Sequence, residues 1–168
     1  VKLKAPVDNT FTESVDTFAH ATFRAAKYYL SCKSTNGEVM NVEALVTHNG
    51  SEAFITTFNE AFSGSAALCE FNASIVGSNV VVSAAGFGTN LTVSGFRVIL
   101  KDNESASTGD RVNIIGQTTI SSTATAIDTF SDNSFTAAHY IVCATNSGES
   151  AASATEAIVI SDGSAAFI

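Results

Sequence analysis

The sequence predicts an all-β protein built as an antiparallel β-sandwich of the jelly-roll or immunoglobulin-like type. Three observations support this class. Short apolar or alternating stretches recur with turn signals about every 8–12 residues. Ala, Ser, Thr, Val and Asn dominate the chain, and β-branched residues fit pleated, half-buried surfaces. A stretch in the first third of the chain also recurs at its end, so we expect one full copy of the sandwich and the start of a second.

The chain is expected to open with a short edge strand, because Val-Lys-Leu-Lys alternates, and this strand should end at Pro6. Residues 8–14 are expected to form a loop. The longest strand is predicted over residues 21–33. A helix competes there, because FRAAKYYL also fits a 3.6-residue period. The Ser-Thr-Asn-Gly turn that follows, and the alternation over residues 39–48, favour the strand.

A second turn signal, Asn49-Gly50, predicts a type I′ hairpin turn into a returning strand over residues 52–58. These three strands should form a meander. Further strands are expected over the segments 67–74, 79–85 and 91–100. The continuous apolar run of the middle segment is typical of a strand buried on both sides or central in a sandwich.

The repeat can be counted directly. From Val15 to Tyr28, seven of fourteen residues are identical to those 112 positions later. From Glu43 to Ile55, eight of thirteen are identical to those 113 positions later. A period of this length is the size of one small domain.

The repeat predicts three segments: a first copy over 1–101, a Ser/Thr-rich linker over 102–126 with a short strand near 112–115, and a partial second copy over 127–168. For the incomplete copy, three expectations remain open: the chain continues, a partner supplies strands, or the half-copy packs on the first domain. The retained positions match what strand starts, a core and tight turns need. They are Asp16, Phe18, Phe23, Tyr28, Glu43, Gly50 and Phe54, with Asp128, Phe130, Phe135, Tyr140, Glu156, Gly163 and Phe167 as counterparts.

Charge and composition exclude some functions. The chain has 8 basic and 16 acidic residues, a net charge of −8, and an acidic surface repels nucleic-acid phosphates. No apolar run reaches the roughly 18 residues of a membrane span. Cys32, Cys69 and Cys143 are expected to be small buried hydrophobes, because their number is odd and no CxxC occurs.

Candidate chemistry is sparse in the sequence. The equivalent carboxylates Glu43 and Glu156, like Asp16 and Asp128, would suit a repeated ligand site, but the favoured interpretation is solvent-face or loop residues. His20, His48 and His139 lack metal-ligand spacing. We therefore predict no catalytic, cofactor or metal site, and a protein that is not an enzyme. Tyr28, Tyr29 and Phe62 are candidates for an aromatic sugar platform, although core packing is favoured for most phenylalanines.

Two segments, VDTFAHATFRAAKYYLSC and EALVTHNGSEAFITTF, resemble a repeat of β-rich virion structural proteins of marine tailed phages, mainly cyanophages. The matching residues are Asp16, Thr17, Phe18, Phe23, Arg24, Ala26, Lys27 and Tyr28, then Glu43, Leu45, Val46, His48, Asn49, Gly50, Ala53, Phe54, Ile55 and Thr56. The second copy departs at Thr136, His139 and Ser161. The resemblance implies a particle component and no catalytic residues.

The sequence thus predicts a non-enzymatic structural component of a phage virion: a tail fibre, neck appendage, sheath-associated or capsid-decorating protein. Its partners would be copies of itself, as a homo-oligomer, and other virion proteins. The alternative is an adhesin module that binds host-surface glycans.

Overall fold

The structure is a computed structural model that describes residues 2–8, 12–101, 118–120, 123–130, 136–146 and 151–168. Every regular element in this part of the chain is a β-strand, and every strand pairing is antiparallel. This confirms the predicted all-β antiparallel class, and the arrangement is consistent with a β-sandwich. The described part contains no helix long and apolar enough to cross a membrane.

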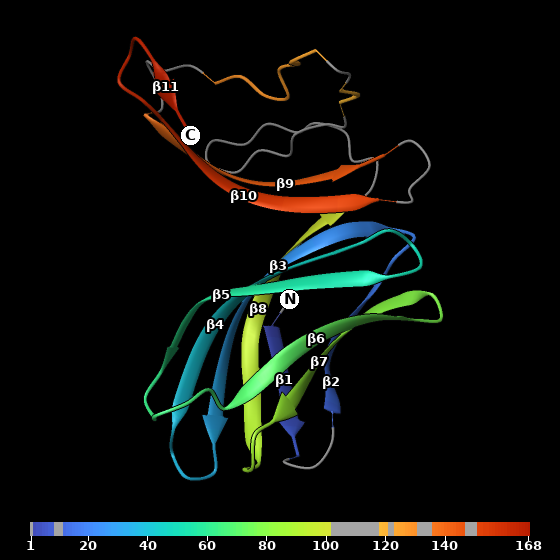
Figure 1. The fold of residues 1–168 in the computed structure, drawn as a ribbon, viewed down its shortest axis with the longest axis vertical. Helices are drawn as coiled ribbons and strands as arrows, with labels where there is room; N and C mark the ends of the chain where they lie inside the picture. Colours follow the sequence, from blue (N-terminus) through green and yellow to red (C-terminus); the bar gives the residue numbers. More distant parts are fainter. Residues whose placement is uncertain (1, 9–11, 102–117, 121–122, 131–135, 147–150) are drawn as a thin grey trace.

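Within these described ranges, eleven strands form three sheets. The first sheet has the order β1-β8-β3-β4-β5, the second β2-β7-β6 and the third β11-β10-β9 (Figure 1). The strands are β1 Lys2–Val7, β2 Thr12–Ala19, β3 Phe23–Ser34, β4 Val39–His48, β5 Ala53–Phe62, β6 Cys69–Val76, β7 Asn79–Gly86, β8 Leu91–Lys101, β9 Ala137–Thr145, β10 Ala152–Ser161 and β11 Ala166–Phe167.

The first two sheets form a sandwich whose core lies between them. Alternation places one set of side chains of each strand inward. From β3 and β4 these are Tyr28, Leu30, Cys32, Met40, Val42, Ala44 and Val46, and from β7 they are Val80, Val82 and Ala84; all are buried. The predicted meander is present as β3-β4-β5, and β7 is the central strand of its sheet.

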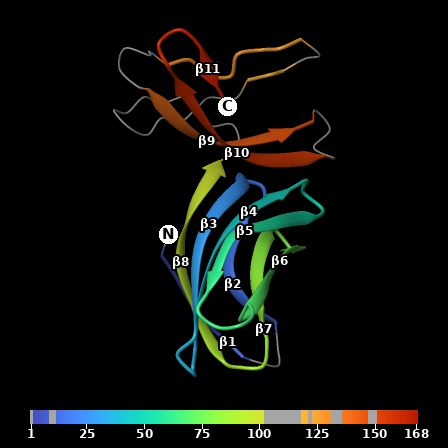
Figure 2. The same cartoon turned by 60° about the vertical axis from the view of Figure 1, so that its left-hand side comes forward.

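The third sheet lies against part of the other face of the first sheet, at one end of the sandwich (Figures 1 and 2). β10 contacts β4, and β9 contacts β3. The outward side chains of β3 and β4 are therefore enclosed between two sheets in this region. Lys27 of β3 is fully buried as a result, and Thr47 of β4 is buried as well.

Several predicted boundaries are wrong. β1 continues through Pro6 to Val7, because it is an edge strand and a missing N–H can face away from the sheet there. β2 begins at Thr12, inside the predicted loop, and β5 extends to Phe62. The linker strand expected near 112–115 lies outside the described residues.

The turn at Asn49 is also different from the predicted type I′ turn. Gly50 has φ +93°, but Asn49 is not in the positive-φ region, and a type I′ turn needs both. The Asn49 side-chain oxygen instead accepts hydrogen bonds from the amides of Ser51 and Glu52, at 3.0 and 2.7 Å. The Asp162 oxygen makes the same contacts with Ser164 and Ala165, at 2.9 and 2.8 Å. An Asx-capped loop therefore occurs at both sequence-equivalent positions.

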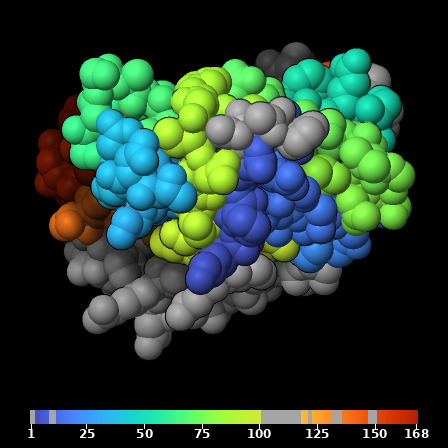
Figure 3. Space-filling model, turned by 90° about the horizontal axis from the view of Figure 1, so that it is seen from below, coloured from blue at the N-terminus to red at the C-terminus, as the bar shows by residue number. Residues whose placement is uncertain are grey.

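At the opposite end of the sandwich, the end of β1, the β3–β4 turn and the start of β8 lie side by side (Figure 3). A hollow of about 570 Å³ lies there, lined by Val7, Glu13, Lys33, Asn90 and Thr92, among others. It is an open surface feature between strand ends, far from the third sheet (Figure 1).

Cys32 and Cys69 are free and buried, with their sulfur atoms 3.5 Å apart across the sandwich core. We expect mild oxidation to join them, because a small movement brings the sulfurs to bonding distance. Closing the intervening loop should raise the free energy of unfolding by up to about 4 kcal/mol. Non-reducing peptide mass spectrometry and denaturation before and after oxidation measure both effects. The Cys32→Ser variant is the control, because it cannot form this disulfide. If both thiols remain free after oxidation of the unmodified chain, the contact is contradicted.

Candidate functional site

The candidate site is centred on Lys27, whose side chain has no exposed surface. Its ammonium group forms an ion pair with Glu43 Oε2 of β4 at 2.6 Å and a second with Glu156 Oε2 of β10. Lys27 and Glu43 lie diagonally across neighbouring strands on one face, because Lys27 pairs with Leu45 and Glu43 with Tyr29. The lysine thus links the first sheet to the third.

Aromatic rings complete the surroundings of the ammonium group. Its nitrogen lies 4.1 Å from the ring centroid of Phe58 and 5.2 Å from that of Tyr29. A desolvated cation over a ring face is stabilised electrostatically. Asn59 donates a hydrogen bond to Glu43 Oε1 at 3.1 Å. Asn59 has φ +52°, the left-handed region that asparagine tolerates. The cation is therefore held by two carboxylates and two rings.

The charges of this cluster stabilise one another. Burial opposes the charged form of Lys27, but its contacts with Glu156 and Glu43 outweigh burial and raise its pKa above the usual 10.5. The hydrogen bond from Lys27, and then that from Asn59, lowers the pKa of Glu43 below the usual 4.5. Both shifts favour the charged forms of Lys27 and Glu43 at neutral pH.

The third sheet contributes the sequence-equivalent pair. His139 stands where Lys27 stands in the first copy, and Glu156 stands where Glu43 stands. His139 Nε2 lies 2.6 Å from Glu156 Oε1. The two sheets therefore meet through the same face of each, with one basic and one acidic residue from each side.

This arrangement corrects the interpretation of both glutamates as solvent-face or loop residues. Each is partly exposed, at 27% for Glu43 and 21% for Glu156, but both contact a buried cation. Sequence reasoning missed this site, because histidine replaces lysine at the equivalent position of the second copy. A usable signal was present, since both residues are basic and both lie beside a retained glutamate.

A groove of about 800 Å³ lies next to the ammonium group, between the two sheets. Its lining combines aromatic, carboxylate, amide and imidazole groups: Tyr29, Glu43, Phe58, Asn59, His139 and Glu156. Such a mixture of apolar surface with a few converging polar groups is typical of a small-molecule site.

Acid should weaken the junction between the sheets. Because the pKa of Glu43 is lowered in the fold, its contribution to stability is present above pH 4.5 and is lost as the pH falls through the folded-state value. The raised pKa of Lys27 leaves its own contribution intact until the pH exceeds 10.5. We expect hydrogen exchange in β9 and β10 to be less protected at about pH 3.5 than at about pH 6. If acid lowers the protection of β9 and β10 equally in the Lys27→Met variant, other carboxylates cause the loss of protection.

A second polar cluster lies inside the sandwich. The Tyr28 hydroxyl donates to Asp16 Oδ2 at 2.8 Å, and Arg97 of β8 forms an ion pair with the same oxygen. Arg97 also donates to the carbonyl of Thr17 at 3.1 Å and lies 5.6 Å from the ring centroid of Phe18. Burial first, and then Asp16, raises the pKa of Tyr28, so the hydroxyl stays protonated and donates.

The equivalent hydrogen bond occurs in the other copy. Tyr140 donates to Asp128 Oδ2 at 2.9 Å. Asp128 is exposed and Tyr140 is partly buried. The Tyr–Asp contact therefore occurs with an arginine in one copy and, among the described residues, without a cation in the other.

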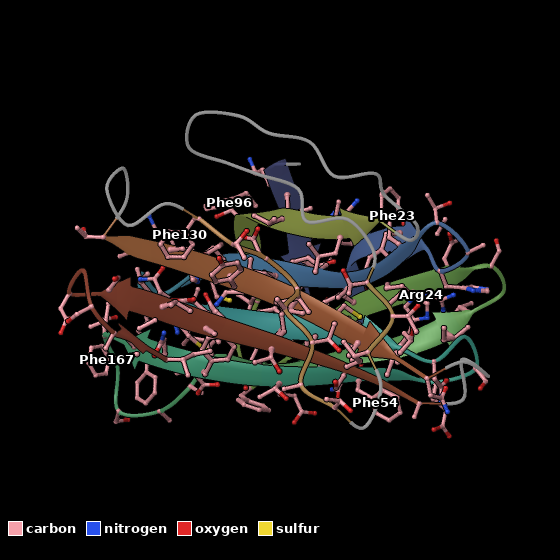
Figure 4. The ribbon with its side chains drawn as sticks, turned by 90° about the horizontal axis from the view of Figure 1, so that it is seen from above. Phe23, Arg24, Phe54, Phe96, Phe130 and Phe167 are labelled. Carbon is pink, nitrogen blue, oxygen red and sulfur yellow. The ribbon has the colours of Figure 1, made fainter. Side chains whose placement is uncertain are left out.

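The other predicted repeat positions occupy varied surroundings (Figure 4). Phe18 is buried, and Phe23 and Phe130 are partly buried. Phe54 and Phe167 are 47% and 53% exposed, so neither is a core residue. Gly50 and Gly163 have φ of +93° and +89° and occupy the turns. Phe135 lies outside the described residues.

The predicted aromatic platform is not formed. Tyr28 points into the core, while Tyr29 stacks on Phe96 on the opposite face, with centroids 4.8 Å apart. Phe62 lies at the far end of β5, and the ring beside Tyr29 at Lys27 is Phe58. The described residues hold no cluster of three or more metal-ligating side chains. His48 is buried, with Nε2 2.6 Å from the carbonyl oxygen of Phe23.

No protein-family model and no curated protein matches the chain. Among solved structures it is similar to the tailspike protein of Acinetobacter phage vB_ApiP_P1, with 17% identity and a TM-score of 0.44 over 60% of this chain and 22% of that one. It is also similar to the tailspike protein of Acinetobacter baumannii phage AM24, with 11% identity and a TM-score of 0.36 over 63% of this chain and 26% of that one. The chain therefore spans about a quarter of either protein.

These matches correct one prediction. The sequence predicted a protein that is not an enzyme, but the matched structures are phage tailspike proteins. The prediction of a non-enzymatic protein is therefore wrong and is not retained.

Proposed function

We propose that this chain is an assembly module of a phage tail protein, located in the virion, in which two copies of one β-module pack face to face. The observation that carries the proposal is the Lys27 junction. One buried cation is held by sequence-equivalent glutamates from two sheets, whose residues are 113 positions apart. A contact of this kind fixes the orientation of one module on the next.

The sequence resemblance to virion repeats supports the particle location. The junction supports the mechanical role, because a buried ion pair that loses one partner is strongly destabilising and so specifies one docking geometry. Within a tail protein, such modules would transmit load through sheet faces instead of through a flexible linker.

Immunogold labelling of purified particles tests the location. An antibody against the chain should label tails of phage that encode it and should not label particles of an unrelated phage. The proposal would be contradicted if the antibody labelled only phage heads. It would also be contradicted if particles stayed unlabelled although the lysate contained the protein.

The inter-sheet groove favours a second candidate function, recognition of a host-surface glycan. Tyr29 and Phe58 offer ring faces, and Glu43, Asn59 and Glu156 offer polar groups for sugar hydroxyls. Glycan-array binding by the full chain, weakened at least tenfold by Phe58→Ala, would support this function. Phe62→Ala is the control, because Phe62 is exposed on the same strand and does not line the groove. Equal loss in both variants, or no binding, would contradict it.

A further inference from the structure

The two long strands that share the repeat sequence differ in their neighbours. β3 lies between β8 and β4, and it is hydrogen-bonded along both edges. β9, its sequence equivalent, pairs with β10 along one edge. Among the described residues, no strand pairs with its outer edge, which corresponds to the β8 edge of β3. A strand edge of this kind can accept a further strand.

The β8 strand shows what the equivalent position holds in the first copy. Arg97 lies opposite Tyr28 in the register and forms an ion pair with Asp16, which also accepts the Tyr28 hydroxyl. Gly95 lies opposite Leu30. A Cβ at Gly95 would collide with the Tyr29 carbonyl oxygen and lie 3.1 Å from the Leu30 Cα. Glycine is therefore needed for this close approach.

The second copy retains the acceptor for such a strand. Tyr140 donates to Asp128 at 2.9 Å, as Tyr28 does to Asp16. No basic side chain in the described part of the chain contacts Asp128. The carboxylate is thus placed where a guanidinium from a β8-type strand would reach it.

We propose that the outer edge of β9 binds an antiparallel β-strand of the β8 type, carrying Gly-x-Arg. Its glycine would lie opposite Val142 and its arginine opposite Tyr140, with the guanidinium paired to Asp128. Gly-x-Arg occurs twice in the chain, at Gly109-Asp110-Arg111 and at Gly95-Phe96-Arg97; residues 91–101, LTVSGFRVILK, contain the second and supply the partner sequence used here. The inference stands on the β9 edge and the Tyr140–Asp128 contact, and it is independent of any location in a particle.

The test titrates a labelled synthetic peptide of residues 91–101 into the full chain and follows fluorescence anisotropy. We expect saturable 1:1 binding, with slower hydrogen exchange in β9. Asp128→Asn in the chain should weaken binding at least tenfold, because it removes the charge but keeps an acceptor for Tyr140. Asp162→Asn is the matched control. It makes the same charge change in the β10–β11 turn and should leave affinity unchanged.

Peptide variants test the same contact without altering the chain. Arg97→Gln in the peptide should also weaken binding tenfold, and should have little further effect on the Asp128→Asn chain. Gly95→Val in the peptide should abolish binding by blocking the backbone approach. The proposal is overturned if no saturable binding occurs, if the valine peptide binds equally well, or if Asp128→Asn and Asp162→Asn have the same effect.

Discussion

Replacing Asp16 by alanine is expected to lower the free energy of unfolding by about 3–5 kcal/mol, the range for removing one partner of a buried ion pair. The Asp16 and Arg97 side chains are only 10% and 11% exposed. Without the carboxylate, the guanidinium of Arg97 and the hydroxyl of Tyr28 both lose their shared acceptor. Arg97 Nε already lacks a hydrogen-bond partner in the described part of the structure, so little compensation is available.

Chemical denaturation of Asp16→Ala and Asp128→Ala provides a matched comparison. The two aspartates hold equivalent positions and accept from equivalent tyrosines. Asp128 is exposed, and no arginine among the described residues forms an ion pair with it, so its loss should cost about 1 kcal/mol or less. The loss in free energy of unfolding for Tyr28→Phe should lie between those of the two aspartate variants, because this change removes one hydrogen bond and leaves the ion pair. Equal losses for the two aspartates would contradict the role of Arg97.

Replacing Lys27 by methionine is expected to loosen the third sheet from the first. Methionine fills much of the lysine volume but leaves Glu43 and Glu156 without the lysine ammonium group that both contact. The two carboxylates are 27% and 21% exposed, and water will offset part of the penalty. We therefore expect a loss of about 2 kcal/mol, below the range for a fully buried pair.

Denaturation and hydrogen exchange of β9 and β10 measure this effect. Lys33→Met is the control, because Lys33 is on the same strand and exposed, and it should change stability by no more than about 0.5 kcal/mol. Adding Glu156→Gln to Lys27→Met should cost less than the sum of the single changes, since it removes one uncompensated charge. Additive losses, or a loss no greater than that of Lys33→Met, would argue against the junction.

The sequence predicted the strands well where alternation and turns agreed. Tyr28, Leu30 and Cys32 alternate with Lys27, Tyr29 and Ser31, and the structure places the first set in the core. The turn signals beside these strands settled the competition with a helix. The boundaries that failed depend on tertiary context. Pro6 is tolerated because β1 is an edge strand, which local sequence does not reveal.

The candidate site could not be predicted from local pattern, for a physical reason. Lys27 looks like an outward residue of a strand, and it would be one if the third sheet were not packed on it. Its burial depends on Glu156, which is 129 positions away. The one hint of this contact in the sequence is that a basic residue accompanies a retained glutamate in both copies. The replacement of lysine by histidine at that position concealed the hint.

Disulfide trapping between the two sheets tests the central claim most directly. Thr47 Oγ1 of β4 lies 3.7 Å from Cys143 Sγ of β9, so Thr47→Cys should form an intramolecular disulfide with Cys143 under mild oxidation. Ser94→Cys, an exposed position on β8, and Cys143→Ser in the Thr47→Cys background are the controls. Peptide mass spectrometry should find the 47–143 link in monomeric Thr47→Cys protein. Cys143 should form no link to position 94 in Ser94→Cys, and position 47 should stay unlinked when Cys143 is replaced by serine. Face-to-face packing would be contradicted if position 47 and Cys143 stayed unlinked, or linked only between molecules.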